Sequence, residues 1–277
     1  MPDPVRQVAR DFDRVAKQYD STEALFSGPI AARLVSVAGV RPGDRVLDVG
    51  CGTGSALIRA AVDAGPGGHV TGVDASQRML DGARAKAAEA GVSVTLVTGD
   101  AVDPPGADGG FDKVIASLVF YLLPDPERAA RAWLRRLRPG GITAFSWNVG
   151  EDPGWERVYG AVDSYVPAGF PTFTGMLRHW PLTSVADLEA MMSDCGCADV
   201  ATTTADLRVR YASPDQWWDS GWSRARRISW QHIPDDPRPA ARQEVLDLLD
   251  GLRDPADGSV VRTVRFGWTV GHRGGGA

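Results

Sequence analysis

Short apolar runs alternate with amphipathic segments from residue 45 to about residue 147. The apolar runs occupy residues 45–49, 69–74, 93–98, 112–116 and 142–147, and each has the length and composition of a buried strand. The segments between them place apolar side chains at helical spacing. This alternation predicts an α/β fold in which right-handed crossovers build a parallel sheet with helices on both faces.

Helix boundaries are marked by capping residues and by turn residues. Ser76 is placed to cap a helix that runs to Ala90, and Gly91 can end it. A second helix follows Pro126 and ends before the run Arg138-Pro-Gly-Gly141, which predicts a turn into the next strand.

The pattern changes after residue 147. Residues 149–183 are rich in Gly, Pro and aromatic side chains and show no clean period, so we expect an insertion or a lid there. A helix over 184–194, a strand near 199–210, a helical pair over 213–253 and a last strand over 261–271 follow. The two late strands predict a hairpin-like edge that completes a seven-stranded, doubly wound, Rossmann-like sheet.

We therefore expect one domain over residues 1–277. Its core is predicted at residues 40–148, about 184–211 and 259–273. A helical cap is predicted from the remaining parts, which are residues 1–39, 149–183 and 212–258.

The run Val46-Leu-Asp-Val-Gly-Cys-Gly-Thr-Gly54 carries the strongest chemical signal. Gly50, Gly52 and Gly54 allow a sharp turn and a ligand lying against the backbone, and the helix that follows favours a carboxylate or phosphate at its N-terminus. The dinucleotide pattern G-x-G-x-x-G fails at its last position, and no lysine supplies a P-loop. Asp48 would repel a pyrophosphate but can bind an ammonium, so a zwitterionic amino-acid tail suits the loop better. Cys51 is expected to be an inert small residue.

This run resembles motif I of the class I S-adenosylmethionine-dependent methyltransferases, and further matches follow in the family's order. The resemblance implies that Asp74 binds the ribose hydroxyls, that Asp100 with Ala101 meets the adenine, and that Ser117 with Leu118 touches the methionyl part. It also implies that Tyr19 caps the cofactor carboxylate. The complete expected cofactor set is Tyr19, Asp48, Gly50, Cys51, Gly52, Gly54, Asp74, Ala75, Met79, Asp100, Ala101, Ser117 and Leu118.

Methyl transfer from a sulfonium needs alignment and exclusion of water, and it needs a general base only where the acceptor must lose a proton. The family's small-molecule branch often has a histidine pair after the fourth strand, where this chain reads Phe120-Tyr-Leu-Leu-Pro124. Tyr121 is therefore only a positional candidate for the base. His179 in the insertion and His232 after the Trp-rich helix are further candidates, although each is also compatible with an ordinary hydrogen-bonded histidine.

Aromatic side chains concentrate at Trp217, Trp218, Trp222 and Trp230. Trp218 and Trp222 are four residues apart, which predicts one shared helix face. These side chains either pack the insertion onto the sheet or, with Trp147, Phe170 and Phe173, wall a pocket for an apolar acceptor. Arg224, Arg226 and Arg227 belong either to a solvated helix face or to a site for an anionic substituent.

Composition limits the remaining choices. The net charge of -5, without blocks of like charge, disfavours nucleic acid as a partner. Three cysteines without zinc-ligand spacing predict no metal and a reduced, cytoplasmic setting. No apolar run is long enough to cross a membrane, and the N-terminus lacks the apolar core of a signal peptide.

The predicted function is S-adenosylmethionine-dependent methylation of an oxygen or nitrogen on a small organic acceptor, such as an aromatic natural product. The predicted cap resembles that of ubiquinone/menaquinone-type and natural-product methyltransferases. Two alternatives stay open: a relative that binds the cofactor but catalyses a non-methylating reaction such as a cyclisation, and a non-catalytic binding module.

Overall fold

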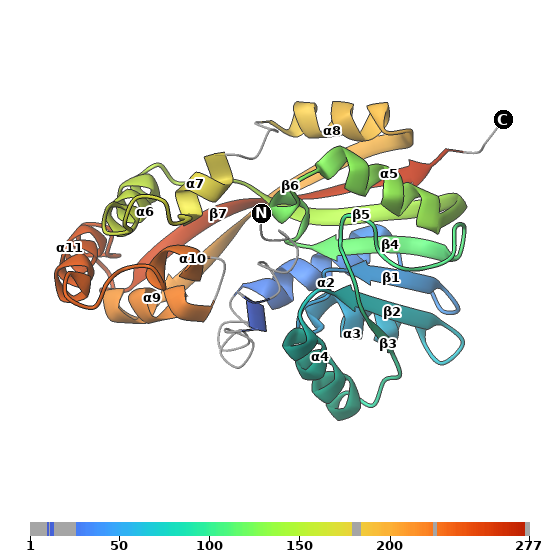
Figure 1. The fold of residues 1–277 in the computed structure, drawn as a ribbon, viewed down its shortest axis with the longest axis horizontal. Coiled ribbons are helices and arrows are strands. Elements are labelled where there is room, and N and C mark those ends of the chain that lie inside the picture. Colours follow the sequence, from blue (N-terminus) through green and yellow to red (C-terminus); the bar gives the residue numbers. More distant parts are fainter. Residues whose placement is uncertain (1–9, 11, 14–25, 179–183, 224–225, 275–277) are drawn as a thin grey trace.

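Seven strands form one sheet in the order β3-β2-β1-β4-β5-β7-β6 (Figure 1). A computed structural model describes residues 10, 12–13, 26–178, 184–223 and 226–274. Five strands run parallel: β1 (Arg45–Val49), β2 (His69–Asp74), β3 (Thr95–Thr98), β4 (Phe111–Ser117) and β5 (Leu137–Glu151). β7 (Val260–Arg273) is antiparallel to both β5 and β6 (Cys197–Tyr211). The predicted seven-stranded α/β sheet with a hairpin-like edge is confirmed.

Helices cover both faces of the sheet (Figure 1). On one face lie α2 (Ser27–Ala38), α3 (Ser55–Ala64) and α4 (Gln77–Glu89), which bury apolar side chains against Val46 and Ile115. On the other face lie α5 (Pro126–Arg136) and α8 (Val185–Asp194). Ser76 and Ser184 cap α4 and α8 by accepting hydrogen bonds from backbone amides three residues on, which confirms the predicted cap of α4.

The outer strands β5, β6 and β7 extend beyond the parallel part of the sheet and carry a second group of helices (Figure 1). We call this group the cap lobe; it comprises α6 (Gly154–Ser164), α7 (Phe173–Arg178), α9 (Pro214–Ser220), α10 (Arg227–Trp230) and α11 (Arg238–Asp250). Its core is separate from the two that flank the sheet and includes Trp155, Tyr211, Trp217 and Val260. The long strands therefore link the cap lobe to the edge of the sheet.

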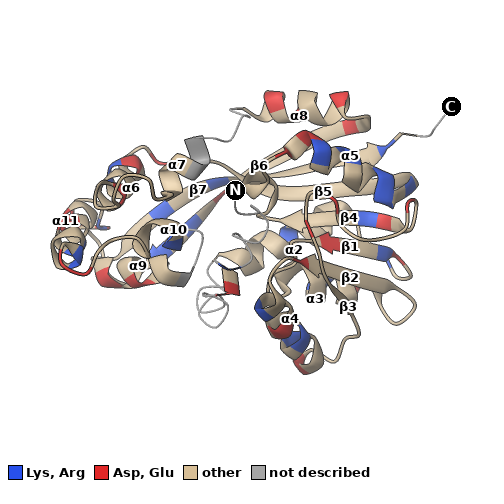
Figure 2. Ribbon diagram, in the orientation of Figure 1, with Lys and Arg blue, Asp and Glu red and all other residues tan. Residues whose placement is uncertain are grey.

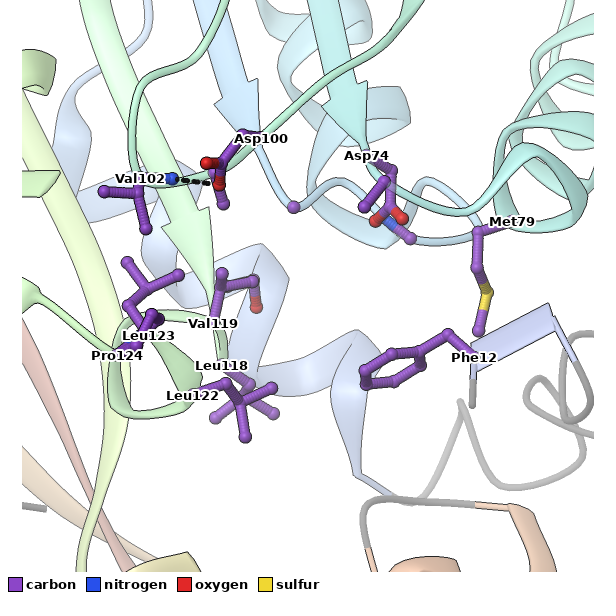
Figure 3. Close-up of a pocket in the computed structure, with 15 residues that line it drawn as sticks. Phe12, Asp74, Met79, Asp100, Val102, Leu118, Val119, Leu122, Leu123 and Pro124 are labelled. Carbon is purple, nitrogen blue, oxygen red and sulfur yellow. Dashed lines mark hydrogen bonds between the residues drawn. The ribbon is translucent and has the colours of Figure 1, made fainter. Parts of the chain in front are cut away.

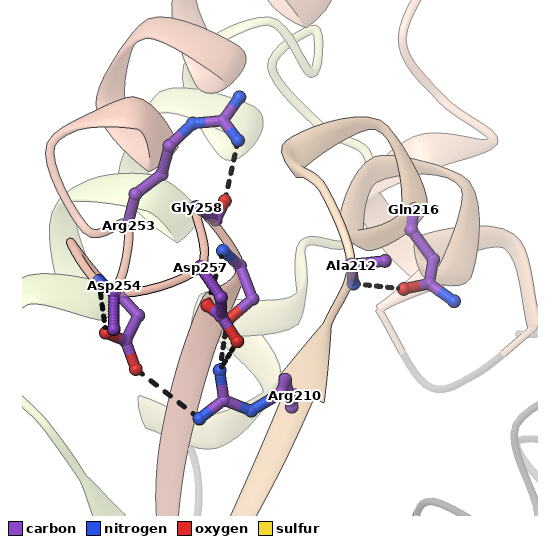
Figure 4. Close-up of polar contacts among 9 residues, drawn as sticks. Arg210, Ala212, Gln216, Arg253, Asp254, Asp257 and Gly258 are labelled. Atoms are coloured by element: carbon purple, nitrogen blue, oxygen red, sulfur yellow. Dashed lines mark hydrogen bonds and ion pairs between the residues drawn. The ribbon is translucent and has the colours of Figure 1, made fainter.

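Polar contacts fix the far end of the β6–β7 pair within the cap lobe (Figure 4). Arg210 at the end of β6 forms ion pairs with Asp257, at 2.6 Å, and with Asp254, at 3.4 Å, in the turn before β7. Arg253 Nη1 donates to the carbonyl of Gly258 at 2.7 Å in the same turn. These bonds satisfy polar groups where both strands leave the sheet.

Several expected elements differ in the structure. Residues 149–183 are expected to form an insertion or a lid without a clean period, and the structure places the end of β5, which extends to Glu151, and then α6 and α7 there. The helical pair over 213–253 is divided, because α9 ends at Ser220 and a 3-10 turn, η3 (Gly221–Ser223), begins there. Trp222 lies in that turn, so the predicted shared helix face with Trp218 is wrong. α2 packs on the sheet, although residues 1–39 were expected in the cap; the rest of the proposed division into core and cap remains a prediction.

Charged residues of both signs are interspersed over the sheet helices and the cap lobe (Figure 2). Among the described residues, no helix has the length and apolar character needed to cross a membrane. Nor does any group of three or more His, Cys, Asp or Glu side chains in that part of the chain have an arrangement suited to a metal ion.

Candidate active site

A cavity lies at the carboxyl edge of the sheet, beyond the ends of β1, β2 and β4 (Figure 3). The strand order reverses between β1 and β4, which is the usual ligand crevice of a doubly wound sheet. The glycine loop, the turns after β2 and β4, the loop after β3 and the N-terminal segment all contribute. The lining residues are Phe12, Gly50, Gly52, Asp74, Ala75, Met79, Asp100, Ala101, Val102, Ser117, Leu118, Val119, Leu122, Leu123 and Pro124.

Glycine is required at the start of the loop after β1. Gly50 has φ +65°, and a Cβ at this position would lie 2.5 Å from Cγ2 of Val119. The chain can therefore turn sharply off β1 and pass under the segment that follows β4. At Gly54 the backbone itself favours glycine, with φ +96°, and a Cβ there would face α4, 3.4 Å from the Cβ of Ala83.

Asp74 is held at the cavity by two backbone amides. Its Oδ2 accepts a hydrogen bond from the Gly52 amide at 2.8 Å, and its Oδ1 accepts one from the Ser76 amide at 2.9 Å. Burial raises the pKa of Asp74, the two amides lower it in part, and the nearby Asp13 carboxylate raises it further. A carboxylate oxygen has two lone pairs, so the group can still accept two hydrogen bonds from a vicinal diol.

The N-terminal segment reaches the same cavity. Asp13 Oδ1 accepts hydrogen bonds from Ser76 Oγ at 2.5 Å and from the Arg78 amide at 3.3 Å, which ties it to the first turn of α4. Phe12 lies beside Met79 on the cavity wall (Figure 3). Neither Phe12 nor Asp13 was expected at the site from the sequence, although both belong to the segment that also contains Tyr19.

The turns after β3 and β4 complete the cavity. Asp100 Oδ1 accepts a hydrogen bond from the Val102 amide at 2.8 Å (Figure 3). Leu118 has φ +59°, which is costly for a residue with a branched side chain, and its amide donates to Ser146 O at 3.2 Å and to Ser146 Oγ at 3.1 Å. Strained backbone of this kind persists where surrounding bonds hold it, commonly at ligand sites.

The two ends of the cavity differ in chemistry. Asp74 and Asp100 lie on its polar side, and they are the only lining residues with ionisable side chains within the described part of the chain. Met79 and Val102 lie beside these aspartates, and the opposite side is formed by the apolar side chains of Phe12, Leu118, Val119, Leu122, Leu123 and Pro124 (Figure 3). Such a cavity can bind a ligand with a polar sugar or base at one end and keep water from a reacting centre at the other.

Comparison with known proteins identifies the family. The family described as "Methyltransferase domain" matches residues 46–141. Over 275 residues the chain is 32% identical to nocamycin O-methyltransferase of Saccharothrix syringae, with 94% of this chain and 96% of that protein covered. The chain belongs to the class I S-adenosylmethionine-dependent methyltransferases.

Further similarities agree with this assignment. The methyltransferase is 33% identical over 173 residues to demethylmenaquinone methyltransferase of Listeria monocytogenes, covering 60% of this chain and 73% of that one. Its fold is similar to that of the [4+2]-cyclase SpnF, with a TM-score of 0.57 and 22% identity over 96% of this chain and 97% of that one. The latter similarity concerns the fold alone.

S-adenosylmethionine is the cofactor of the methyltransferase, and the donor set at the cavity fits it. The fixed carboxylate of Asp74 suits a ribose diol, and Asp100 suits an exocyclic amino group. A Cβ at Gly50 would meet Val119, so glycine is needed for the loop to line the cavity beside Val119. The expected site residues that lie on the wall are Gly50, Gly52, Asp74, Ala75, Met79, Asp100, Ala101, Ser117 and Leu118.

Three expected cofactor residues of the methyltransferase lie outside the lining set. Because strand side chains alternate, Asp48 lies on the same face of the sheet as Val46, the face that α3 covers. Gly54 lies where α3 contacts α4. Burial raises the pKa of Asp48 well above its usual range, the Asp74 carboxylate adds to this, and the Leu57 amide offsets only part. Neither Asp48 oxygen accepts a hydrogen bond of normal geometry. Burial likewise raises the pKa of the Cys51 thiol well above its usual range, as expected for an inert cysteine.

The two candidate bases that the structure describes, Tyr121 and His232, do not line the cavity. Tyr121 lies in the 3-10 turn η2 (Phe120–Leu122) and packs against the cluster that contains Phe120, outside the lining set. His232 lies in the cap lobe, where its ring stacks on Phe170 at a centroid distance of 4.6 Å. Tyr19 and His179 lie outside the described residues.

The Trp-rich segment of the methyltransferase packs the cap lobe. Trp217 and Trp230 are buried and lie 5.6 Å apart between ring centroids. Trp218 is buried against Trp230, so these rings pack the cap lobe, as the first of the two interpretations expects. Arg226 is only 3% exposed, so a solvated helix face, the first of the two interpretations of the arginine run, is wrong for this residue.

Proposed function

We propose that this enzyme transfers the methyl group of S-adenosylmethionine to an oxygen or nitrogen of a small natural-product acceptor. The observation that carries the proposal is one cavity with two fixed carboxylates on its polar side and an apolar surface opposite. The similarity to nocamycin O-methyltransferase, which extends over nearly the whole of both chains, supports an acceptor of this class.

The polar side of the cavity is proposed to bind the nucleoside. Asp74 accepts hydrogen bonds from the ribose hydroxyls, because the Gly52 and Ser76 amides orient its oxygens. Asp100 accepts from the adenine amino group, and Ala75, Met79 and Ala101 contact the adenosine. Gly50, Gly52, Ser117 and Leu118 are proposed to contact the methionyl part. Asp48, Cys51, Gly54 and Tyr19 remain predicted contacts.

When bound, the cofactor supplies a methyl carbon that its sulfonium already activates. The chain's own contribution is then alignment of the acceptor and exclusion of water by Leu118, Val119 and Leu122. An acceptor that is already ionised needs no general base. For one that must lose a proton, Tyr121, His179 and His232 remain the predicted bases.

The alternatives have no comparable support. A cyclase shares the fold, but at 22% identity its reaction does not transfer to this chain. A module that only binds the cofactor would not need the apolar side of the cavity. We also propose a cytoplasmic location, with which the free cysteines Cys51, Cys195 and Cys197 are compatible. We further propose that nucleic acid is not a partner, which the net charge of -5 supports.

The test is transfer of labelled methyl groups. Purified enzyme is given methyl-labelled S-adenosylmethionine and a panel of phenols, carboxylic acids, enols and amines, and S-adenosylhomocysteine is measured alongside labelled product. We expect acceptor-dependent formation of both products in equal amounts, which Asp74→Ala abolishes and Asp206→Ala, on the exposed edge of the sheet, leaves intact. Conversion of an acceptor without S-adenosylhomocysteine would contradict methyl transfer.

A further inference from the structure

Arg226 is a buried cation in the cap lobe. It lies just before α10, and its guanidinium stacks over the ring of Trp217, with Cζ 4.7 Å from the ring centroid. Nη2 donates to Ser220 Oγ at 3.3 Å, whereas Nη1 is buried and has no acceptor. Within the described part of the chain, Arg226 forms no ion pair.

Two further donors without acceptors lie in the same aromatic group as this guanidinium. The indole Nε1 atoms of Trp217 and Trp230 are both buried and neither donates a hydrogen bond. Their rings are neighbours, 5.6 Å apart between centroids. The cluster therefore offers one unpaired cationic donor and two unpaired neutral donors within one packed group of side chains.

A second buried arginine lies close to the same cluster. Arg262 on β7 is 3% exposed, and its Cζ lies 5.6 Å from the centroid of Tyr159; Cζ of Arg226 lies 5.9 Å from that centroid. Arg262 also lies near the ring of Phe26, at 5.9 Å, and Phe26 packs both on the sheet and on the cap lobe. The cluster thus extends to the junction between the cap lobe and the sheet.

Asp163, the acidic residue that bonds Ser229 of α10, is already used. Asp163 Oδ1 accepts from Ser229 Oγ at 2.5 Å, and Oδ2 accepts from the hydroxyl and amide of Thr174. It therefore holds α7 and α10 to α6. A buried guanidinium without a counter-ion is unfavourable unless an anion completes it, and a set made of donors is complementary to anionic oxygens.

We propose that the cluster of Arg226, Trp217 and Trp230 binds the anionic group of a small organic carboxylate that serves as the methyl acceptor. This inference rests on the proposed function and narrows it to one substrate class. The carboxylate anchors the acceptor at the cap lobe, and the atom that receives the methyl group is elsewhere on the molecule.

The experiment compares acids with their uncharged amides. Full-length enzyme saturated with S-adenosylhomocysteine is titrated with benzoate, 2-naphthoate and decanoate, and with the primary amide of each. At least one acid should bind about tenfold more tightly than its amide, because only the acid forms charge-assisted hydrogen bonds with the guanidinium. Arg226→Gln should abolish this preference, and Arg226→Lys should retain part of it.

Arg157→Gln is the matched control, since this arginine lies on α6 with Tyr159 but is exposed; it should keep the preference. Thermal unfolding of the ligand-free variants shows whether Arg226→Gln folds, and loss of the preference with an unchanged melting temperature separates binding from a structural role. Equal or absent binding of every acid and its amide, or a preference that survives Arg226→Gln, would overturn the proposal. Failure to bind S-adenosylhomocysteine, with the acid preference intact, would instead contradict the proposed function alone.

Discussion

Gly50→Ala tests whether the glycine loop is fixed by contact with the segment after β4. Two costs add at this position. The left-handed backbone, with φ +65°, costs a residue with a Cβ about 1–2 kcal/mol. The new Cβ would also lie 2.5 Å from Cγ2 and 2.8 Å from Cγ1 of Val119, and overpacking of this kind costs about 1–3 kcal/mol. The free energy of unfolding should therefore fall by about 2–5 kcal/mol.

The two costs can be separated with matched variants. Gly39 is also left-handed, with φ +61°, but a Cβ added there would meet nothing within 4 Å, so Gly39→Ala should show the backbone cost alone. Val119→Ala removes both methyl carbons that the Gly50→Ala side chain would meet. Urea unfolding of the single and double variants then gives the coupling energy. Equal losses for Gly50→Ala and Gly39→Ala, or no coupling with Val119→Ala, would refute the proposed packing of the loop.

Three further predictions concern other parts of the molecule. Because the pKa of Asp48 is raised, folding favours its protonated form; its contribution to stability is full below the unfolded pKa and is lost as pH rises through the folded pKa. Urea unfolding measured against pH should show a gain in the free energy of unfolding on acidification, up to about 1.4 kcal/mol per pH unit, and Asp48→Asn should lack this gain. Asp13→Ala should weaken S-adenosylhomocysteine binding about tenfold in calorimetry, because the segment that places Phe12 on the cavity wall loses its hydrogen bond to Ser76. Asp13→Asn keeps an acceptor oxygen and should bind nearly normally, and equal affinities of the two variants would contradict this role. Thr269→Val should lower the free energy of unfolding by about 1–3 kcal/mol, since the buried Trp147 Nε1 donates to its hydroxyl, and an unchanged value would show that this hydrogen bond is not needed.

The parallel half of the sheet could be predicted because its signals are local. β1, β2 and β4 each carry their own apolar run, and Ser76 and Ser184 mark helix starts through side chains that cap the adjacent amides. The carboxylates Asp74 and Asp100 could be placed at the cavity for a similar reason. Asp74 ends β2 and Asp100 lies just after β3, and parallel strands have their carboxyl ends at the same edge of the sheet.

Features that depend on distant partners could not be predicted. α6 buries Trp155, Val158 and Val162 at helical spacing, but the Gly and Pro residues around it obscured the pattern. The length of β5 beyond residue 147 is set by pairing with β7, far along the chain.

The apolar side of the cavity was missed for the same reason. Leu122, Leu123 and Pro124 face the cavity only because η2 follows the turn at Leu118. Asp48 has the right chemistry for an ammonium, but strand alternation turns it towards α3. The face of the sheet towards which a strand side chain points depends on the pairing register of that strand, and the composition of an apolar run does not specify this register.

The central claim is that the cavity at the carboxyl edge binds S-adenosylmethionine through Asp74. Calorimetric titration of the purified protein with S-adenosylmethionine and S-adenosylhomocysteine, with NAD as a control ligand, tests it most directly. We predict micromolar-range binding of both adenosyl ligands and none of NAD, with affinity reduced at least about tenfold by Asp74→Ala and unchanged by Asp206→Ala. Folded protein that binds neither adenosyl ligand, or that binds them equally well with Asp74→Ala, would contradict the claim.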